Sequence, residues 1–307
     1  MSVDPQVQQL LDAIAAIGGA KTTAMSPQEA RSGYEFMLSR PAPAEDAIAT
    51  EDLCIAGPEG DVPVRIYRPP VQGAGPTVVF FHGGGWVIGS VNTHDAQARL
   101  TASGTGAVVV SVDYRLAPEH RFPAALDDCA AATQWALDHA KDLGGSVDAV
   151  AVAGDSAGGN LAAAVALRRR DNGERSLAAQ LLIYPVTDAS RATPSYAENA
   201  EGYFLDADTM RWFWSHYLGG EAPTAESSII DAAELGGLPP AVVVTAQYDP
   251  LRDEGNAYAQ RLRKAGVDVT LIECPGLIHG FYGMTDYVGL AAKESARFLD
   301  AFRLLLA

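Results

Sequence analysis

A serine framed by glycines is the pattern in this chain that most suggests covalent chemistry. The stretch GDSAG, residues 154–158, follows the apolar run 149–153 and precedes an alanine-rich stretch that favours a helix. A chain that turns from strand to helix within so few residues must bend sharply, and glycines two positions before and after Ser156 remove Cβ atoms that would collide. Such a turn strains Ser156 and presents its hydroxyl for nucleophilic attack. The alternatives for a glycine-rich turn of this kind are a phosphate site or a plain corner.

A nucleophilic serine needs a general base and an acid that orients the base. Asp249 and His279 each follow a short apolar run that predicts a strand, in the chain order serine, acid, histidine. An aspartate before a proline also commonly caps a turn, so this reading of Asp249 stays open. Asp253 and Glu254 are nearby alternatives, although acids are favoured in the first turn of a helix by its dipole alone.

The oxyanion of an acyl-transfer reaction needs hydrogen-bond donors, and a run of three glycines is suited to supply them. The run HGGG follows another predicted strand and leaves the N–H groups of Gly84 and Gly85 unobstructed. With the N–H of Ala157 they would make a hole with three donors. His82 is expected to anchor this loop by hydrogen bonding. The histidines that we expect to be structural or solvated are His94, His120, His139 and His216.

Strands and helices alternate along most of the chain, which positions these residues. Apolar runs predict strands at 51–56, 62–67, 77–81, 107–112, 149–153, 178–184, 241–245 and 267–273. Helices are predicted at 95–102, 123–142, 157–170, 254–265 and 288–306. The first two strands form a hairpin, and the rest indicate a mostly parallel sheet covered by helices on both faces. Ligands bind such sheets at the carboxyl ends of the strands, where the candidate residues fall.

Two segments depart from this alternation. Residues 1–48 are predicted to be helical, and residues 188–235 form a helical insertion rich in aromatic side chains. The basic run 168–170, near the end of the helix after Ser156, is expected to complement the helix dipole and to be solvated. The chain's cysteines have no metal-ligand spacing and are expected to be buried and reduced: Cys54, Cys129 and Cys274.

The composition excludes several classes of function. The 307 residues include 22 basic and 38 acidic side chains, which gives a formal net charge of −16. So negative a chain disfavours nucleic acids and anionic membranes, which bind proteins through lysine and arginine. No stretch approaches the roughly 18 apolar residues of a membrane span, and the first residues lack the basic start of a signal peptide. We therefore expect no nucleic-acid partner, no stable membrane insertion and a cytoplasmic location.

The motifs, taken together, resemble a known family. HGGGW (82–86), DYRLAPEHRFPAA (113–125), GDSAGGN (154–160), YDPLRDEG (248–255) and IHGF (278–281) occur in the order of the hormone-sensitive-lipase branch of the α/β-hydrolases. More narrowly, they resemble its bacterial and archaeal carboxylesterases. The similarity covers residues 50 to 307, and the amino-terminal part matches only as a helical cap of the kind that this family carries.

The resemblance implies an α/β-hydrolase fold, with a mostly parallel eight-stranded sheet, helices on both faces and a helical cap. Residues 49–307 would be the catalytic domain, and the cap would come from 1–48 and about 188–235. The implied roles are Ser156 as nucleophile, Asp249 as acid, His279 as base, and Gly84, Gly85 and Ala157 as the oxyanion hole. Arg115 and Glu119 would belong to an ion-pair network under the site.

The activity implied by the resemblance is that of a serine carboxylesterase acting on neutral esters of short to medium acyl chain. The reaction would pass through an acyl-enzyme and need no cofactor or metal, and its partner would be a small-molecule ester. A homodimer through the last strand and the carboxyl-terminal helix is also expected from the family. The alternatives are an amide, lactone or other acyl substrate at the same site, or a ligand receptor without catalysis. Receptors of this family lack the histidine, so the presence of His279 argues against the last alternative.

Overall fold

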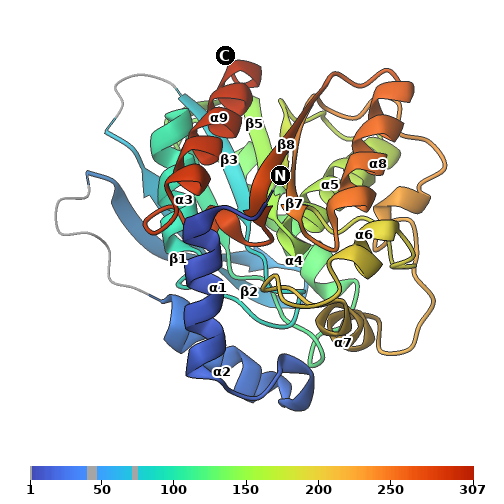
Figure 1. Cartoon of the computed structure of the whole chain (residues 1–307). Helices are drawn as coiled ribbons and strands as arrows, with labels where there is room; N and C mark the ends of the chain where they lie inside the picture. Colours follow the sequence, from blue (N-terminus) through green and yellow to red (C-terminus); the bar gives the residue numbers. More distant parts are fainter. Residues whose placement is uncertain (1, 40–46, 71–74) are drawn as a thin grey trace.

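The computed structural model describes residues 2–39, 47–70 and 75–307 and contains one central sheet. Its strands are β1 (Ala49–Gly57), β2 (Gly60–Arg68), β3 (Gly75–Phe81), β4 (Val108–Val112), β5 (Gly145–Asp155), β6 (Gln180–Ile183), β7 (Ala241–Tyr248) and β8 (Val269–Ile278). They lie in the order β1-β2-β4-β3-β5-β6-β7-β8 (Figure 1). The pairs β1–β2 and β2–β4 are antiparallel, and all other neighbouring pairs are parallel. The predicted eight-stranded, mostly parallel sheet is confirmed.

Helices cover the two faces of this sheet, and further helices flank it. They are α1 (Pro5–Ile17), α2 (Pro27–Leu38), α3 (Asp95–Thr105), α4 (Ala124–Asp138), α5 (Ala157–Asp171), α6 (Pro194–Glu198), α7 (Ala207–Leu218), α8 (Arg252–Lys264) and α9 (Gly289–Leu305). Short 3-10 turns occur at Thr22–Ala24, Ile229–Asp231 and Phe281–Gly283. No helix among the described residues is long and apolar enough to cross a membrane.

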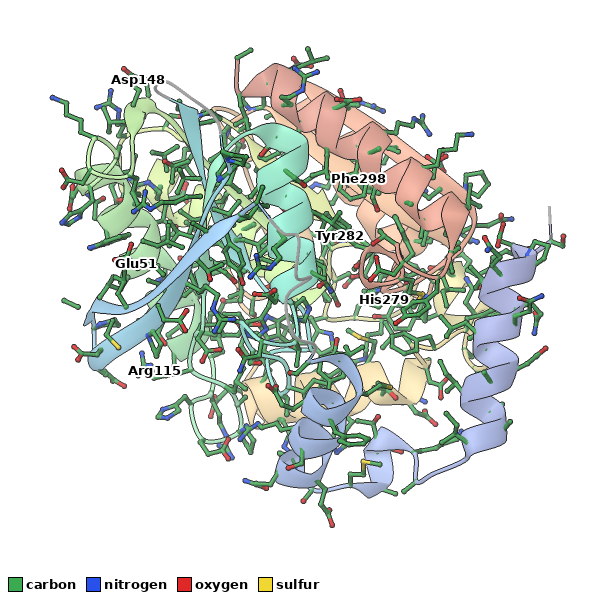
Figure 2. The ribbon with its side chains drawn as sticks, turned by 90° about the vertical axis from the view of Figure 1, so that its left-hand side faces the viewer. Glu51, Arg115, Asp148, His279, Tyr282 and Phe298 are labelled. Atoms are coloured by element: carbon green, nitrogen blue, oxygen red, sulfur yellow. The ribbon has the colours of Figure 1, made fainter. Side chains whose placement is uncertain are left out.

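The strand β3 shows why both faces are covered, because its side chains are buried on both sides. Val79 and Phe81 pack in the core that α4, α5 and α8 close, whereas Val78 and Phe80 pack in the core closed by α3 and α9. Successive residues of a strand point to opposite faces, so an uninterrupted apolar run needs cover on each. On the second face, Phe298 of α9 packs edge-on against Tyr282 at 5.1 Å between ring centroids (Figure 2).

The two segments that break the alternation are helical, as predicted. The first contains α1 and α2, and the second contains α6 and α7. In Figure 1, α2 and α7 both lie along the lower edge of the molecule. Residues 40–46, within the first predicted segment, lie outside the described residues. The division of the chain into a cap and a catalytic domain stays a prediction.

The basic run at the end of α5 is not solvated as predicted. Arg168 pairs with Asp127 of α4 and with Glu226 of the insertion, both at 2.7 Å. Arg169 is 5% exposed and pairs with Glu174 at 2.8 Å. The prediction was wrong because α5 is covered by α4 and by the insertion, whose acids are distant in sequence.

The expectation for the cysteines holds for two of the three. Cys129 and Cys274 are buried and free, but Cys54 is exposed. Cys54 lies in β1, the first strand of the sheet, where its neighbour Ile55 is buried. Because side chains alternate along a strand, the burial of Ile55 turns Cys54 outward.

The junction between β5 and α5 depends on a close approach to β3. A Cβ atom on Gly158 would lie 1.9 Å from the carbonyl oxygen of Phe81, and one on Gly154 would lie 2.7 Å from the same oxygen. No side chain fits at either distance. The glycines relieve collisions at the bend, as the sequence predicts, and they also allow the first turn of α5 to rest on the end of β3.

This contact predicts a sharp difference between two glycine-to-alanine substitutions. Gly158→Ala should lower the free energy of unfolding by about 3 kcal/mol or more, because its methyl group meets backbone atoms that cannot move aside. Gly33→Ala, in the middle of α2 with no atom within 4 Å of the added Cβ, should raise it by about 0.5–1 kcal/mol. Urea unfolding followed by circular dichroism measures both changes. Equal effects of the two substitutions would contradict the prediction.

Candidate active site

Ser156 lies at the turn between β5 and α5 in a strained backbone conformation. Its φ of 56° and ψ of −118° are rare for a residue with a side chain. Backbone hydrogen bonds hold the strained residue on both sides. Its N–H donates to the carbonyl of Ile183 at 2.8 Å, and its carbonyl accepts the N–H of Val186 at 3.2 Å. The turn predicted from the glycine spacing is thus present, and it lies at the carboxyl end of β5.

The structure brings the serine, the histidine and the acid together. The Nε2 atom of His279 lies 3.0 Å from Oγ of Ser156, and its Nδ1 atom lies 2.8 Å from Oδ2 of Asp249. The three side chains are buried, with exposed fractions of 6%, 6% and 0% for Ser156, His279 and Asp249. With Nδ1–H donating to Asp249, Nε2 carries the lone pair and can accept the serine proton.

The two carboxylates near Asp249 bind partners other than His279, and this difference distinguishes the candidate acids. Asp249 also accepts the N–H of Leu251 at 2.8 Å through Oδ1, so it caps a turn and faces the histidine at the same time. Asp253 accepts the N–H of Ser195 at 2.9 Å. Glu254 accepts backbone N–H groups at the start of the insertion. Among these three carboxylates, Asp249 is the one hydrogen-bonded to His279.

The strand that leads to His279 is longer than predicted. We expected a strand over 267–273 and then a loop, but β8 continues to Ile278 and His279 follows it directly. Ile278 pairs with Tyr248 of β7 after a shift of register. Pro275 is tolerated because β8 is the last strand of the sheet, and an edge strand can accommodate a residue without an N–H donor.

The glycine run after β3 contacts Asp155, the residue before Ser156, through Gly83. Gly84 and Gly85 have φ values of 115° and 58°, and a Cβ on either would lie 2.1 Å from an atom of Ile88 or Phe213. Within the described part of the chain, no acceptor takes the N–H groups of these two glycines. The N–H of Ala157 belongs to the first turn of α5, which has no acceptor within its own helix and lies at the positive end of the helix dipole.

His82 anchors this loop as predicted. Its Nδ1 atom lies 2.7 Å from the carbonyl oxygen of Gly83, and its ring stacks on Tyr114 at 4.2 Å. Burial lowers the pKa of His82 to about 3. The imidazole is therefore neutral at neutral pH, and Nδ1–H donates to the carbonyl.

Two groups behind the loop were not identified from the sequence as part of the site. His94, which we expected to be structural or solvated, is structural: it is 1% exposed, and its Nε2 atom lies 3.2 Å from the nitrogen of Gly83. Asp155, directly before the nucleophile, accepts the same N–H at 2.9 Å. The signal that points to Asp155 is an acid inside the glycine-framed turn. His94 carries no comparable signal.

Arg115 and Glu119 form separate ion pairs instead of one network. Arg115 pairs with Asp128 at 2.8 Å and with Glu59. Glu119 pairs with Arg31 of α2 at 2.6 Å. The second pair links α2 to the segment that follows β4.

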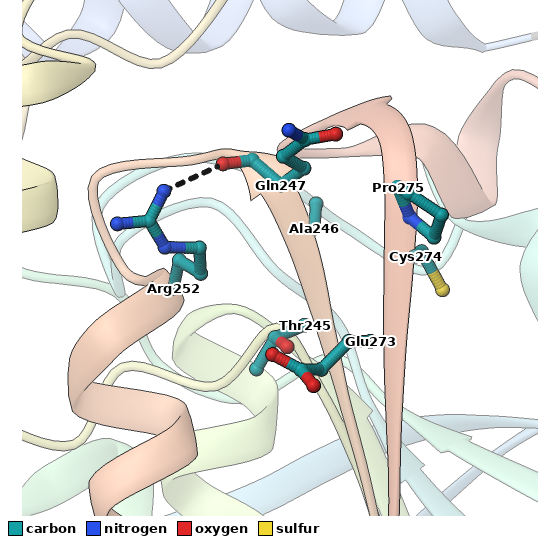
Figure 3. A pocket seen from close by; sticks show the side chains of 7 residues that line it. All are labelled: Thr245, Ala246, Gln247, Arg252, Glu273, Cys274 and Pro275. Atoms are coloured by element: carbon teal, nitrogen blue, oxygen red, sulfur yellow. Dashed lines mark hydrogen bonds between the residues drawn. The ribbon is translucent and has the colours of Figure 1, made fainter. Parts of the chain in front are cut away.

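A pocket of about 370 Å³ lies near the ends of β7 and β8, and it is not lined by Ser156, Asp249 or His279 (Figure 3). Its lining residues are Thr245, Ala246, Gln247, Arg252, Glu273, Cys274 and Pro275. Arg252 donates to the carbonyl of Gln247 across one side of it at 3.2 Å. None of the residues around Ser156 lines this pocket.

Among the described residues, no group of three or more histidine, cysteine, aspartate or glutamate side chains is arranged to hold a metal.

The arrangement around Ser156 is suited to acyl transfer. It combines a hydroxyl in contact with an imidazole, a carboxylate that orients this imidazole, and a neighbouring glycine loop with two free backbone N–H groups among the described residues. A buried site of this kind strengthens each of these electrostatic contacts because little water competes for them.

Comparison with known proteins agrees with this chemistry. The family model described as alpha/beta hydrolase fold matches residues 78–283. The chain is 41% identical to the carboxylesterase NlhH of Mycobacterium tuberculosis (strain ATCC 25618 / H37Rv) over 99% of this chain and 96% of that protein. It is 37% identical to an ethyl acetate hydrolase of Pseudomonas putida over 99% of each chain. The crystal structure of a thermostable esterase from Pseudomonas putida ECU1011 superposes with a TM-score of 0.95 at 37% identity, covering 100% of this chain and 98% of that one.

The geometry predicts unequal effects of two neutralised carboxylates. Asp249→Asn should lower kcat for p-nitrophenyl acetate by about 10⁴-fold, because the amide favours the wrong tautomer of His279. Asp253→Asn should lower it by less than about 10-fold, since Asp253 contacts Ser195 and Arg252 but not the histidine. Circular dichroism checks that both variants are folded. The reverse ranking would assign the acid to Asp253.

Proposed function

We propose that this chain, which belongs to the alpha/beta hydrolase family and is a carboxylic ester hydrolase, cleaves neutral esters of short to medium acyl chain through an acyl-enzyme on Ser156. The observation that carries the proposal is the contact of 3.0 Å between Nε2 of His279 and Oγ of Ser156, with Asp249 on the other side of the imidazole. The motifs that carry the resemblance place the chain in the hormone-sensitive-lipase branch of the family.

The proposed cycle uses each of these groups twice. His279 takes the proton of Ser156 as the hydroxyl oxygen attacks the ester carbonyl, and Asp249 stabilises the imidazolium that forms. The carbonyl oxygen becomes an oxyanion and accepts hydrogen bonds from the N–H groups of Gly84, Gly85 and Ala157. The C–O bond then breaks and the alcohol leaves with the proton from His279. Water repeats the same steps on the acyl-enzyme and releases the acid.

The size and charge of the substrate follow from the walls of the site and from the net charge. The ring of Phe213 from α7 packs directly on Gly85, and the ring of Phe204 lies beside Gly280, next to His279. These aromatic walls favour an apolar acyl group of limited length. A net charge of −16 disfavours anionic substrates. The relative named ethyl acetate hydrolase supports the choice of a short chain.

The proposal also covers the bond that is attacked, the oligomeric state and the cellular location. An amide, lactone or other acyl bond could be attacked by the same groups, whereas a receptor without catalysis is disfavoured because His279 is present and in contact with Ser156. A homodimer is supported by the position of β8 at the edge of the sheet. A cytoplasmic location is supported by cysteines that are all free, one of them exposed.

The first test removes the nucleophile. Ser156→Ala should lower kcat for p-nitrophenyl acetate by about 10⁶-fold, because the group that forms the acyl-enzyme is missing. A fluorophosphonate probe should label the parent protein on the peptide that contains Ser156 and should leave the variant unlabelled. Residual activity near that of the parent, or labelling of another serine, would remove Ser156 from its proposed role.

A second test concerns acyl-chain length. Phe213→Leu should raise the ratio of kcat/KM for p-nitrophenyl hexanoate to that for the acetate by about 10-fold, because the smaller side chain leaves room beside Gly85. Trp212→Leu is the matched control on the same helix, since Trp212 packs edge-on against His216 of α7 at 4.4 Å. A series of esters from acetate to palmitate gives both ratios. If the two substitutions change the ratio equally, Phe213 does not limit the chain length.

A further inference from the structure

We propose that His94 and Asp155 act as positioning residues that fix the oxyanion hole by holding the backbone N–H of Gly83 between them. The inference deepens the proposed function and rests on it, because it assigns the alignment of the oxyanion donors to a buried pair outside the triad. Neither side chain takes part in proton transfer to the substrate in the proposed cycle.

The geometry of the pair is that of two acceptors around one donor. The nitrogen of Gly83 lies 2.9 Å from Oδ1 of Asp155 and 3.2 Å from Nε2 of His94. The two acceptor atoms lie 3.5 Å apart. Both side chains are buried, with exposed fractions of 1% for His94 and 4% for Asp155. A buried N–H that lost these partners would carry the full cost of desolvation, so the pair strongly favours one orientation of this peptide group.

The next two residues after Gly83 are the proposed donors Gly84 and Gly85. Their direction depends on the preceding peptide group because the chain here follows φ values that only glycine adopts readily. The loop also touches Asp155 directly: a Cβ on Gly83 would lie 2.5 Å from Oδ2 of that residue. Oxyanion donors stabilise the transition state only when they lie within hydrogen-bond distance of the developing charge, so a small shift of the loop lowers the rate.

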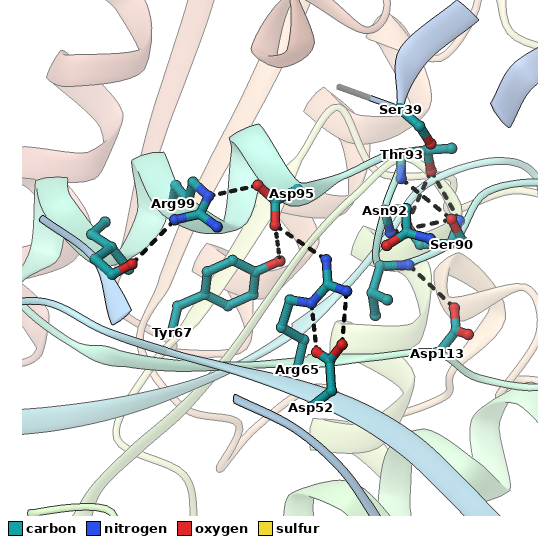
Figure 4. Close-up of polar contacts among 12 residues, drawn as sticks. Ser39, Asp52, Arg65, Tyr67, Ser90, Asn92, Thr93, Asp95, Arg99 and Asp113 are labelled. Atoms are coloured by element: carbon teal, nitrogen blue, oxygen red, sulfur yellow. Dashed lines mark hydrogen bonds and ion pairs between the residues drawn. The ribbon is translucent and has the colours of Figure 1, made fainter. Parts of the chain in front are cut away.

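The tautomer of His94 follows from its neighbours. Nδ1 of His94 lies 2.9 Å from the hydroxyl oxygen of Thr93. That hydroxyl donates its hydrogen to the carbonyl of Ser90 at 3.0 Å and accepts the N–H of Ser90 at 2.9 Å (Figure 4). With the N–H of Gly83 donating to Nε2, the proton of the neutral ring is on Nδ1, and Nδ1–H donates to the Thr93 hydroxyl oxygen. Nε2 is then left with its lone pair directed at the N–H of Gly83.

Residues on both sides of His94 make hydrogen bonds that fix the segment carrying its ring. Asp95, the next residue, accepts from Tyr67 at 2.8 Å and pairs with Arg99 at 2.5 Å (Figure 4). Before it, the hydroxyl of Ser90 donates to Glu35 of α2 at 2.9 Å. The segment that carries His94 is therefore fastened both to the sheet and to a helix of the predicted cap.

Asp155 remains an acceptor in this environment. The pKa of the Asp155 carboxyl lies below its ordinary value, although burial by itself would raise it. An ionised carboxylate accepts hydrogen bonds and donates none, which matches the direction of the bond from Gly83.

The experiment compares variants of His94 in the full chain. His94→Leu removes the acceptor and should lower kcat for p-nitrophenyl acetate by about 10- to 100-fold, less than the loss of a whole oxyanion donor. KM should stay within about twofold, because the substrate carbonyl is neutral before attack. The affinity for a trifluoromethyl ketone, which forms an oxyanion on Ser156, should fall by the same factor as kcat. His94→Gln should restore most of kcat, since the amide oxygen can reach the position of Nε2.

His139→Leu is the matched control, because His139 lies in the turn after α4 and its Nδ1 atom contacts the carbonyl of Trp135. It should leave kcat and inhibitor affinity unchanged. If His94→Leu does not fold, Thr93→Val removes the group that orients the imidazole and should give the same signature at smaller size.

The proposal is overturned if His94→Leu, or Thr93→Val in its place, is folded and keeps kcat within twofold of the parent. It is also overturned if kcat falls while the affinity for the trifluoromethyl ketone is unchanged, since this pattern excludes the oxyanion hole. These outcomes are distinct from failure of the proposed function, which is tested by the activity of Ser156→Ala in the same assay.

Discussion

The strained conformation of Ser156 is the constraint on which the rest of the site depends. A residue with a side chain at φ 56° costs of order 1–3 kcal/mol, so the surrounding structure must hold it there. The bonds to Ile183 and Val186 do so from the neighbouring strand β6 and the segment after it. Asn160, one turn along α5, donates to the carbonyls of Val186 and Ser227 and adds a second support. With the serine fixed, the donors and the base can approach it from separate loops without moving it.

Helices of the two predicted cap segments contact two of these loops. The first, α2, reaches the oxyanion segment through Arg31, whose guanidinium donates to the carbonyls of Val87 and Ala117, both at 2.7 Å. From the insertion, α6 reaches the loop of the triad acid, where Ser195 donates to the carbonyl of Pro250 at 2.6 Å. The two helices are thereby connected to the glycine loop and to the loop that carries Asp249. Such support is what a preorganised site requires, because donors that must move lose much of their effect.

Features that depend on local sequence patterns were predictable, whereas features that depend on contacts between distant residues were not. Ser156, Asp249 and His279 were predictable because each follows a strand, and parallel strands bring their carboxyl ends to one edge. The full length of β8 was not predictable, because its last residues pair with β7 only after a shift of register. His94 was missed because its partners, Gly83 and Asp155, are brought beside it only by the folded sheet. Arg168 was misjudged for the same reason, since its acids, Asp127 and Glu226, come from a distant helix and from the insertion.

The loop of the triad acid holds three carboxyl groups, and their different surroundings explain how one of them can serve His279. Glu254 is buried, and burial raises its pKa well above the ordinary value despite the N–H groups of Thr187 and Asp188 that it accepts. The charge of Asp249 raises it further. Both effects disfavour a second negative charge beside Asp249 in this region of low dielectric. Glu254 thus fastens the start of the insertion to the loop, whereas Asp249 contacts the imidazole, a division of roles that two carboxyl groups acquire through their environment.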